Sequence, residues 1–183
     1  IQEIAVDYEG HAASLNTKPM TALILMSILR PQLDSVNMIN APVIARERNI
    51  QVSETKREVN RDYPTLLRIT LKTEQGSYKI AGSLIGAERP RIVALGDFCV
   101  EVEPSPFMLY VRNEDKPGLI GRLGTLLGEN NINIANFNLG RTGNQALALV
   151  SLDQAVGPEL IAKIGKLQGV LRARELKFTI PKN

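Results

Sequence analysis

The sequence predicts an α+β protein of two domains, over residues 1–104 and 107–183. Helical spacing of apolar residues near the start gives way to period-two alternation, which is typical of a strand-rich α+β domain. Pro104 and Pro106 then interrupt the chain, because proline disfavours helix and removes donors from a strand ladder. Beyond them, strand patterns alternate with two amphipathic helical patterns.

The first domain is expected to open with a strand over residues 1–10. A helix over 18–29 follows, with Asn16 or Thr17 as its cap and Pro31 at its end. The next segment, 35–49, again has helical spacing, but Pro42 lies inside it and predicts a boundary or kink.

The rest of the first domain predicts successive strands, with "EQG" as the turn between the second and third. These strands are expected to form a meander, over residues 50–58, 65–74, 77–86, 91–96 and 98–103.

The second domain begins with an expected strand, "FMLYV" at 107–111, followed by a helix with Pro117 in its first position. Two strands, a second helix and a last strand follow, over 132–140, 145–153, 157–168 and 169–178. The resulting order, βαββαβ, predicts a ferredoxin-like fold. The apolar parity of the last strand changes near Glu175, which indicates a bulge.

Composition restricts the class of protein. Hydrophobic residues make up 44% and charged residues 22% of the 183, as in ordinary globular domains. The chain has one cysteine, Cys99, and no apolar run long enough for a membrane span, so we expect a cytoplasmic protein without membrane contact. Because it starts with Ile1 inside a strand pattern, we expect a piece of a longer chain.

Nucleotide, metal and catalytic motifs are missing from the sequence. Neither G-x-G-x-x-G nor G-K-[ST] occurs, and Gly121 and Gly124 are interpreted as sites of close packing against another backbone. The only histidine, His11, leaves no catalytic triad, and Cys99 has no partner for a metal site. The net charge of +3 is mild and no aromatic residues interleave the basic cluster at 171–177, so nucleic-acid binding is not expected.

The turn before the first helix of the second domain is the candidate site. Unpaired N–H groups at Gly118, Leu119 and Ile120 suit a carboxylate, and Asn113 and Asp115 can accept hydrogen bonds from an ammonium group. Lys116 and Pro117 lie in the same turn, and the amides of Asn131 and Asn133 could complete the site in the same chain or in a symmetry mate. A free amino acid fits this pattern. Alternatively, Asp115 caps the helix and the asparagines satisfy turns.

The stretch "NEDKPGLIGRLGTLLGENNINIANF" resembles the ACT domain, and "NAPVIARER" with "AGSLIGAERPRIVAL" resembles the intervening domain of long-form D-3-phosphoglycerate dehydrogenase. The resemblance implies a non-catalytic regulatory region, while the parent enzyme oxidises 3-phosphoglycerate with NAD at the start of serine synthesis. It implies no cofactor in this chain, L-serine as the effector between paired ACT domains of a homo-oligomer, and Asn133 supplied by the facing subunit. Arg91 falls near a basic position of an anion site found in some relatives.

Two other functions fit the same residues. One is a subunit of iron–sulfur L-serine dehydratase, which also carries an ACT domain and would hold its cluster cysteines on a partner chain. The other is a dimerisation module that binds no ligand. The "NAPVIARER" stretch favours the dehydrogenase.

Overall fold

The computed structural model describes residues 1–60, 62–86 and 88–179, and its contacts divide the chain into two units between Pro90 and Arg91. Unit 1 contains β1 (Glu3–Gly10), α1 (His11–Ser14), α2 (Lys18–Leu29), the 3-10 helix η1 (Arg30–Gln32), α3 (Ala41–Glu47), β2 (Gln51–Arg57), β3 (Thr65–Thr73) and β4 (Gly76–Ile85). Unit 2 contains β5 (Arg89–Leu95), whose first two residues precede the division, and then β6 (Phe98–Val102), β7 (Phe107–Glu114), α4 (Leu119–Glu129), β8 (Ile134–Thr142), β9 (Gln145–Leu152), α5 (Pro158–Gly165) and β10 (Val170–Lys177).

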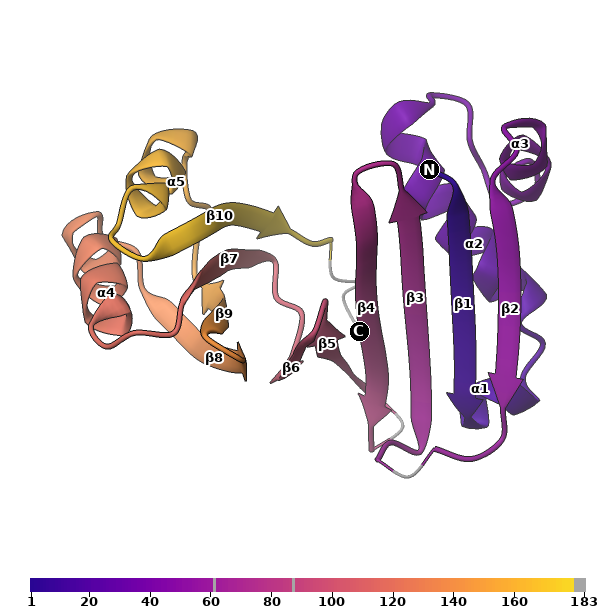
Figure 1. Cartoon of the computed structure of the whole chain (residues 1–183), viewed down its shortest axis with the longest axis horizontal. Helices are drawn as coiled ribbons and strands as arrows, with labels where there is room; N and C mark the ends of the chain where they lie inside the picture. Colours follow the sequence, from indigo (N-terminus) through magenta and orange to yellow (C-terminus); the bar gives the residue numbers. More distant parts are fainter. Residues whose placement is uncertain (61, 87, 180–183) are drawn as a thin grey trace. The chain divides into compact units, whose positions relative to one another are not determined.

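The strands of unit 1 lie side by side in the order β2-β1-β3-β4 (Figure 1). The strand ranges agree with the prediction, but the expected meander is wrong at its first step, because β1 lies between β2 and β3. β1 and β2 are parallel, and parallel neighbours need a crossover, which the helices between them provide. β3 and β4 form the hairpin that was expected around the "EQG" turn.

The helix boundaries of unit 1 follow the proline pattern. Thr17 immediately precedes α2, as expected, but its hydroxyl donates to a carboxylate oxygen of Glu54 at 2.9 Å and caps nothing. Pro42 lies in the first turn of α3, so the predicted boundary there is confirmed.

One face of the unit 1 sheet packs against these helices, with Ile4, Val6 and Tyr8 of β1 fully buried. The Tyr8 hydroxyl shares a hydrogen bond of 2.7 Å with the hydroxyl of Thr21 on α2. Burial raises the pKa of Tyr8 above its ordinary 10.0; the bond to Thr21 opposes this rise, and the charge of Glu54 adds to it. Folding therefore favours the neutral form of the phenol.

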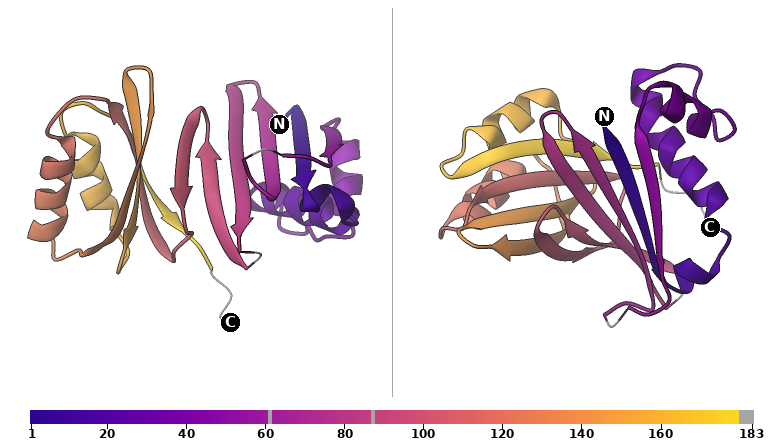
Figure 2. Two further views of the ribbon diagram at one scale, coloured as in Figure 1. Left: turned by 90° about the horizontal axis from the view of Figure 1, so that it is seen from below. Right: turned by 45° about the vertical axis from the view of Figure 1, so that its right-hand side comes forward.

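The sheet of unit 2 has the order β10-β7-β9-β8, which confirms the expected ferredoxin-like βαββαβ arrangement. Both helices, α4 and α5, cover the same face of this sheet (Figure 2). The core between them is built from aliphatic side chains, including Leu109, Leu123, Leu127, Val150 and Ile164.

The opposite face of that sheet is covered by the hairpin of β5 and β6. Phe98, Val100 and Val102 pack there against Leu147 and Leu149 of β9, and all five side chains are buried. β9 is therefore buried on both faces, and every residue from Ala146 to Leu152 is buried. The sequence assigned this hairpin to the first domain, whereas the contacts group most of it with unit 2; the boundary at 104–107 stays a prediction.

Two local expectations in unit 2 are wrong. α4 begins at Leu119 rather than Pro117, because Gly118 precedes it with a φ of 94°, outside the helical region. The irregularity of β10 lies at Leu171 rather than near Glu175. The change of parity has another cause: Ala173 faces the helices, whereas Leu176 faces the hairpin.

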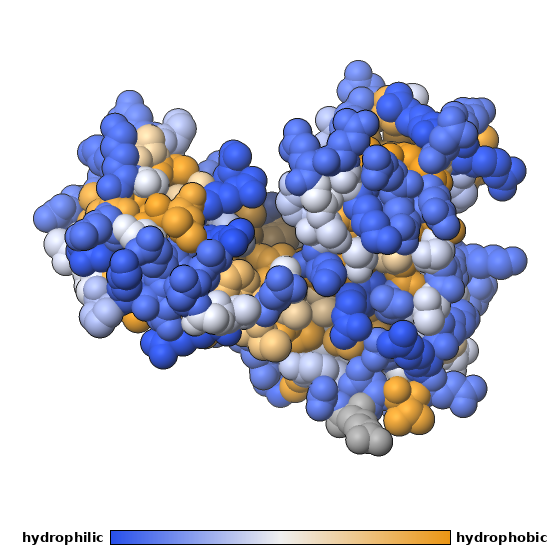
Figure 3. Space-filling model, in the orientation of Figure 1, coloured by the Kyte–Doolittle hydropathy of each residue, from blue (hydrophilic) through white to orange (hydrophobic). Residues whose placement is uncertain are grey.

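Hydrophilic residues cover most of the face drawn in Figure 3, with apolar residues showing between them. Within the described residues, every helix is too short or too polar to cross a bilayer. The same part of the chain contains no cluster of three or more histidine, cysteine or acidic residues placed to hold a metal ion.

Candidate ligand-binding site

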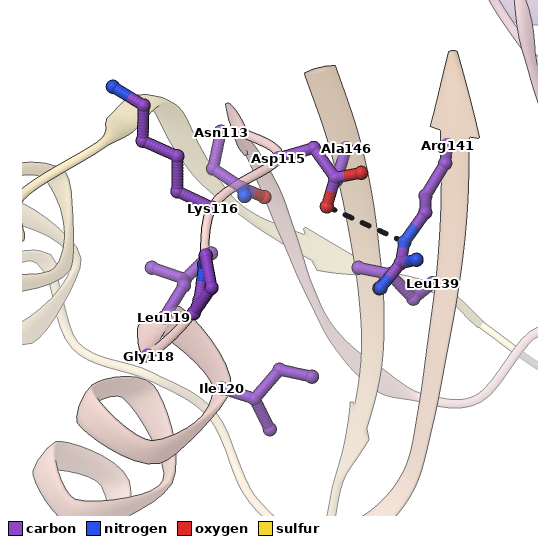
Figure 4. A pocket seen from close by; sticks show the side chains of 10 residues that line it. Asn113, Asp115, Lys116, Gly118, Leu119, Ile120, Leu139, Arg141 and Ala146 are labelled. Carbon is purple, nitrogen blue, oxygen red and sulfur yellow. Dashed lines mark ion pairs between the residues drawn. The ribbon is translucent and has the colours of Figure 1, made fainter. Parts of the chain in front are cut away.

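A pocket of about 480 Å³ opens at the start of α4 (Figure 4). Its wall is formed by the turn between β7 and α4 together with side chains of β8 and β9. The lining residues are Asn113, Asp115, Lys116, Pro117, Gly118, Leu119, Ile120, Leu139, Arg141 and Ala146. The structure thus brings together seven residues that the sequence predicted as a site.

Hydrogen-bond acceptors lie on one side of the pocket. Asn113 is 3% exposed, and its Nδ2 donates to the carbonyl oxygen of Glu114 at 2.6 Å. Its Oδ1 atom, however, is buried and has no hydrogen-bond partner among the described residues. A buried oxygen without a partner costs free energy, so a donor that entered the pocket would relieve that cost. Asp115 adds a carboxylate whose side chain is 30% exposed.

Hydrogen-bond donors lie at the start of α4. No side chain of the described residues caps this helix, and its first backbone bond is the donation from the Arg122 N–H to the Gly118 carbonyl at 3.1 Å. The helix itself therefore leaves the N–H groups of Leu119 and Ile120 without acceptors. The alternative in which Asp115 caps α4 is wrong.

Arg141 is a lining residue that the sequence analysis missed. Its Nε atom lies 3.5 Å from Oδ1 of Asp115, across the pocket (Figure 4). Leu139 and Ala146 were missed as well, and they give the pocket an apolar floor. Strand parity could have found Arg141, because Phe137, Leu139 and Arg141 alternate along β8 on the face that carries α4.

Three predicted residues do not contribute polar side chains to this pocket. Lys116 is at its edge, and its ammonium pairs with the Glu114 carboxylate at 2.7 Å. Asn131 follows the far end of α4 with a φ of 54°, as a turn residue does. Asn133, which immediately precedes β8, donates to a carboxylate oxygen of Asp153 at 2.7 Å. Along the direction of β8 it is roughly 25 Å from Arg141. Within one chain, Asn133 is therefore outside the pocket.

Two other expectations concern anions and nucleotides. The guanidinium of Arg91 pairs with the carboxylate of Glu103, so an anion there would compete with that contact. Gly121 and Gly124 lie inside α4 and form no loop between strand and helix, so they do not suit a dinucleotide. Their interpretation as close-packing sites is wrong for the described chain, since nothing lies within 4 Å of a Cβ built at either.

Comparison with known proteins agrees with this arrangement. The βαββαβ unit is an ACT domain, because the family model of the ACT domain matches residues 107–169. The model of the D-3-phosphoglycerate dehydrogenase intervening domain matches residues 1–96, more than half of the chain. The chain therefore belongs to the D-3-phosphoglycerate dehydrogenase intervening-domain family, and the predicted resemblance is confirmed for both domains.

Curated relatives carry the same name. D-3-phosphoglycerate dehydrogenase of Archaeoglobus fulgidus is 34% identical over 94% of this chain and 34% of its own length. The enzyme of Synechocystis is 33% identical over 97% of the chain and 33% of its own length, and that of Bacillus subtilis is 29% identical over 95% and 34%. The chain thus spans about a third of the length of the curated relatives it matches.

Proposed function

We propose that this chain is the regulatory region of an NAD-dependent D-3-phosphoglycerate dehydrogenase and that its pocket binds L-serine as a feedback effector. The oxidation of 3-phosphoglycerate to 3-phosphohydroxypyruvate then takes place in the remaining two thirds of such an enzyme. The relatives' shared name and the two matched domains support this assignment over an L-serine dehydratase subunit.

The Oδ1 atom of Asn113, buried with no hydrogen-bond partner in the described part of the chain, is the observation that carries the ligand proposal. This oxygen and the Asp115 carboxylate offer acceptors for an ammonium group, whereas the first N–H groups of α4 offer donors for a carboxylate. A free amino acid bears both groups a few ångströms apart. A simple anion would use only the helix end, and a simple amine only the two side chains.

A second copy of the chain would complete the site. Asn133 lies far from the pocket within one chain, and its amide becomes useful only if a neighbouring ACT domain presents it. A ligand held between two copies favours one placement of the subunits, and coupling of this kind is typically ~1–3 kcal/mol. An effector without preference between two placements would regulate nothing.

Isothermal titration calorimetry of the chain with L-serine tests the proposal. We expect saturable binding that Asp115→Asn weakens roughly 10- to 100-fold, because hydrogen bonds to charged groups are the stronger ones. Asn133→Ala should also weaken binding, and L-serinamide, which lacks the carboxylate, should bind less tightly than L-serine. Asp34→Asn, an exposed acid of unit 1, serves as the matched control.

Unchanged affinity in both Asp115→Asn and Asn133→Ala would remove this pocket as the effector site. A chain that forms dimers on sizing chromatography but gives no heat with any amino acid would instead support the ligand-free dimerisation module.

A further inference from the structure

At its C-terminal end, residues 139–142, strand β8 faces the pocket on one side and the hairpin of β5 and β6 on the other. Leu139 and Arg141 point toward α4 and line the pocket. The residues between and after them, Gly140 and Thr142, face the hairpin of β5 and β6. Because side chains alternate along a strand, a shift of this segment would move both sets together.

Gly140 makes the closest approach between β8 and the hairpin. A Cβ atom built at this position would lie 2.6 Å from the carbonyl oxygen of Cys99 and 2.8 Å from a methyl carbon of Val100. Atoms do not approach so closely without displacement, and one of the two partners here is backbone. Any larger residue at 140 must therefore separate the hairpin from β8.

Thr142 adds a directed contact next to it. Its hydroxyl donates to the carbonyl oxygen of Asp97, in the turn of the hairpin, at 2.7 Å. The apolar contacts of Phe98, Val100 and Val102 hold the rest of the hairpin on the same face of the sheet. The hairpin is thus fixed to β8 on both sides of the residue that faces Asp115.

We propose that Gly140 and Thr142 are positioning residues for the pocket, so that ligand binding and hairpin docking are coupled through β8. This inference rests on the proposed function of the pocket. The docked hairpin holds β8 where Arg141 and Leu139 form the pocket wall opposite Asp115. A ligand that requires this wall stabilises the docked hairpin in return, since coupling between two sites is reciprocal.

The position of the hairpin in the chain suggests what this coupling would regulate. β5 begins where unit 1 ends, so the hairpin is the segment that connects unit 1 to the ACT domain. Occupancy of the pocket would therefore change the stability of the connecting segment itself.

Calorimetry with L-serine and hydrogen exchange of the β6 amides, Phe98 to Val102, on the full chain test this proposal. In the unsubstituted chain, L-serine should slow the exchange of these amides, which lie outside the pocket. Gly140→Ala should speed their exchange and weaken L-serine binding about tenfold, within the usual range of allosteric coupling. Thr142→Val is the milder change and serves as the second variant if Gly140→Ala does not fold. It should weaken L-serine binding roughly threefold.

Two controls separate coupling from general damage. Gly128→Ala makes the same change where a new Cβ meets no atom of the described residues within 4 Å, and it should leave both readouts unchanged. Thr142→Ser keeps the hydroxyl and should bind L-serine as the unsubstituted chain does.

Faster β6 exchange in Gly140→Ala and Thr142→Val with an unaltered L-serine affinity would overturn the coupling and leave the proposed function intact. Absence of L-serine binding to the unsubstituted chain would overturn the proposed function, and this coupling with it.

Discussion

β1 in unit 1 and β9 in unit 2 are both central strands, yet their burial differs. From Glu3 to Tyr8 of β1, the fully buried residues Ile4, Val6 and Tyr8 alternate with partly exposed residues. Along β9, every residue after Gln145 is buried. The difference follows from the layers: helices pack on one face of β1, whereas β9 lies between two helices and a hairpin. An apolar run without alternation therefore indicates a second covering layer.

The largest expected effect concerns the second layer. Leu149→Ala removes a fully buried side chain from the face of β9 that the hairpin covers. If this face is a true core, the change should lower the free energy of unfolding by about 2–5 kcal/mol, measured by urea unfolding followed by circular dichroism. Leu171→Ala, at a leucine that is 50% exposed, is the control and should change it by less than about 0.5 kcal/mol. Equal effects of the two changes would contradict the two-layer account.

A second prediction concerns Tyr8 in unit 1. Its folded-state pKa is raised by burial, so the folded state keeps the phenol proton to higher pH than the unfolded state does. The stability that this provides is complete below the unfolded pKa near 10.0 and is lost as the pH rises through the raised folded value. Tyr8→Phe should cost about 0.5–1.5 kcal/mol at neutral pH through the lost bond to Thr21.

Urea unfolding between about pH 8 and 11, a range that spans the ordinary tyrosine pKa, checks the direction in which the free energy of unfolding changes with pH. The fall in stability at the alkaline end should be smaller in Tyr8→Phe than in the unsubstituted chain. A steeper fall in the variant would show that the phenol is not held neutral by burial.

The smallest expected effect is a gain in stability. Gly124 lies in the middle of α4, where a new Cβ meets nothing within 4 Å in the described part of the chain. Gly124→Ala should therefore raise the free energy of unfolding by roughly 0.5–1 kcal/mol, since alanine has the better helix propensity. Thermal unfolding of the variant and of the unsubstituted chain measures this gain in stability. A loss of stability would indicate that a neighbouring copy packs against this position.

Much of the fold could be predicted because its signals are local. The cap candidates Asn16 and Thr17 predicted the start of α2, and Pro42 predicted the boundary at α3. Period-two alternation predicted every strand from β2 to β6. The order of strands in unit 1 could not be predicted in this way, since insertion of β1 between β2 and β3 depends on contacts between segments distant in the sequence. The start of α4 was misplaced because Pro117 suits a first turn, whereas Gly118 adopts a left-handed conformation.

The sequence by itself determined the βαββαβ order and the turn in which Asn113 and Asp115 lie, because residue types and short spacings specify these locally. Only the tertiary structure decided that Arg141 of another strand faces Asp115 and that a hairpin covers the second face of the sheet. It also decided that Oδ1 of Asn113 is buried with no partner among the residues that the structure describes. These features depend on strand register and on packing between segments far apart in the chain, and local patterns carry no information about such distances.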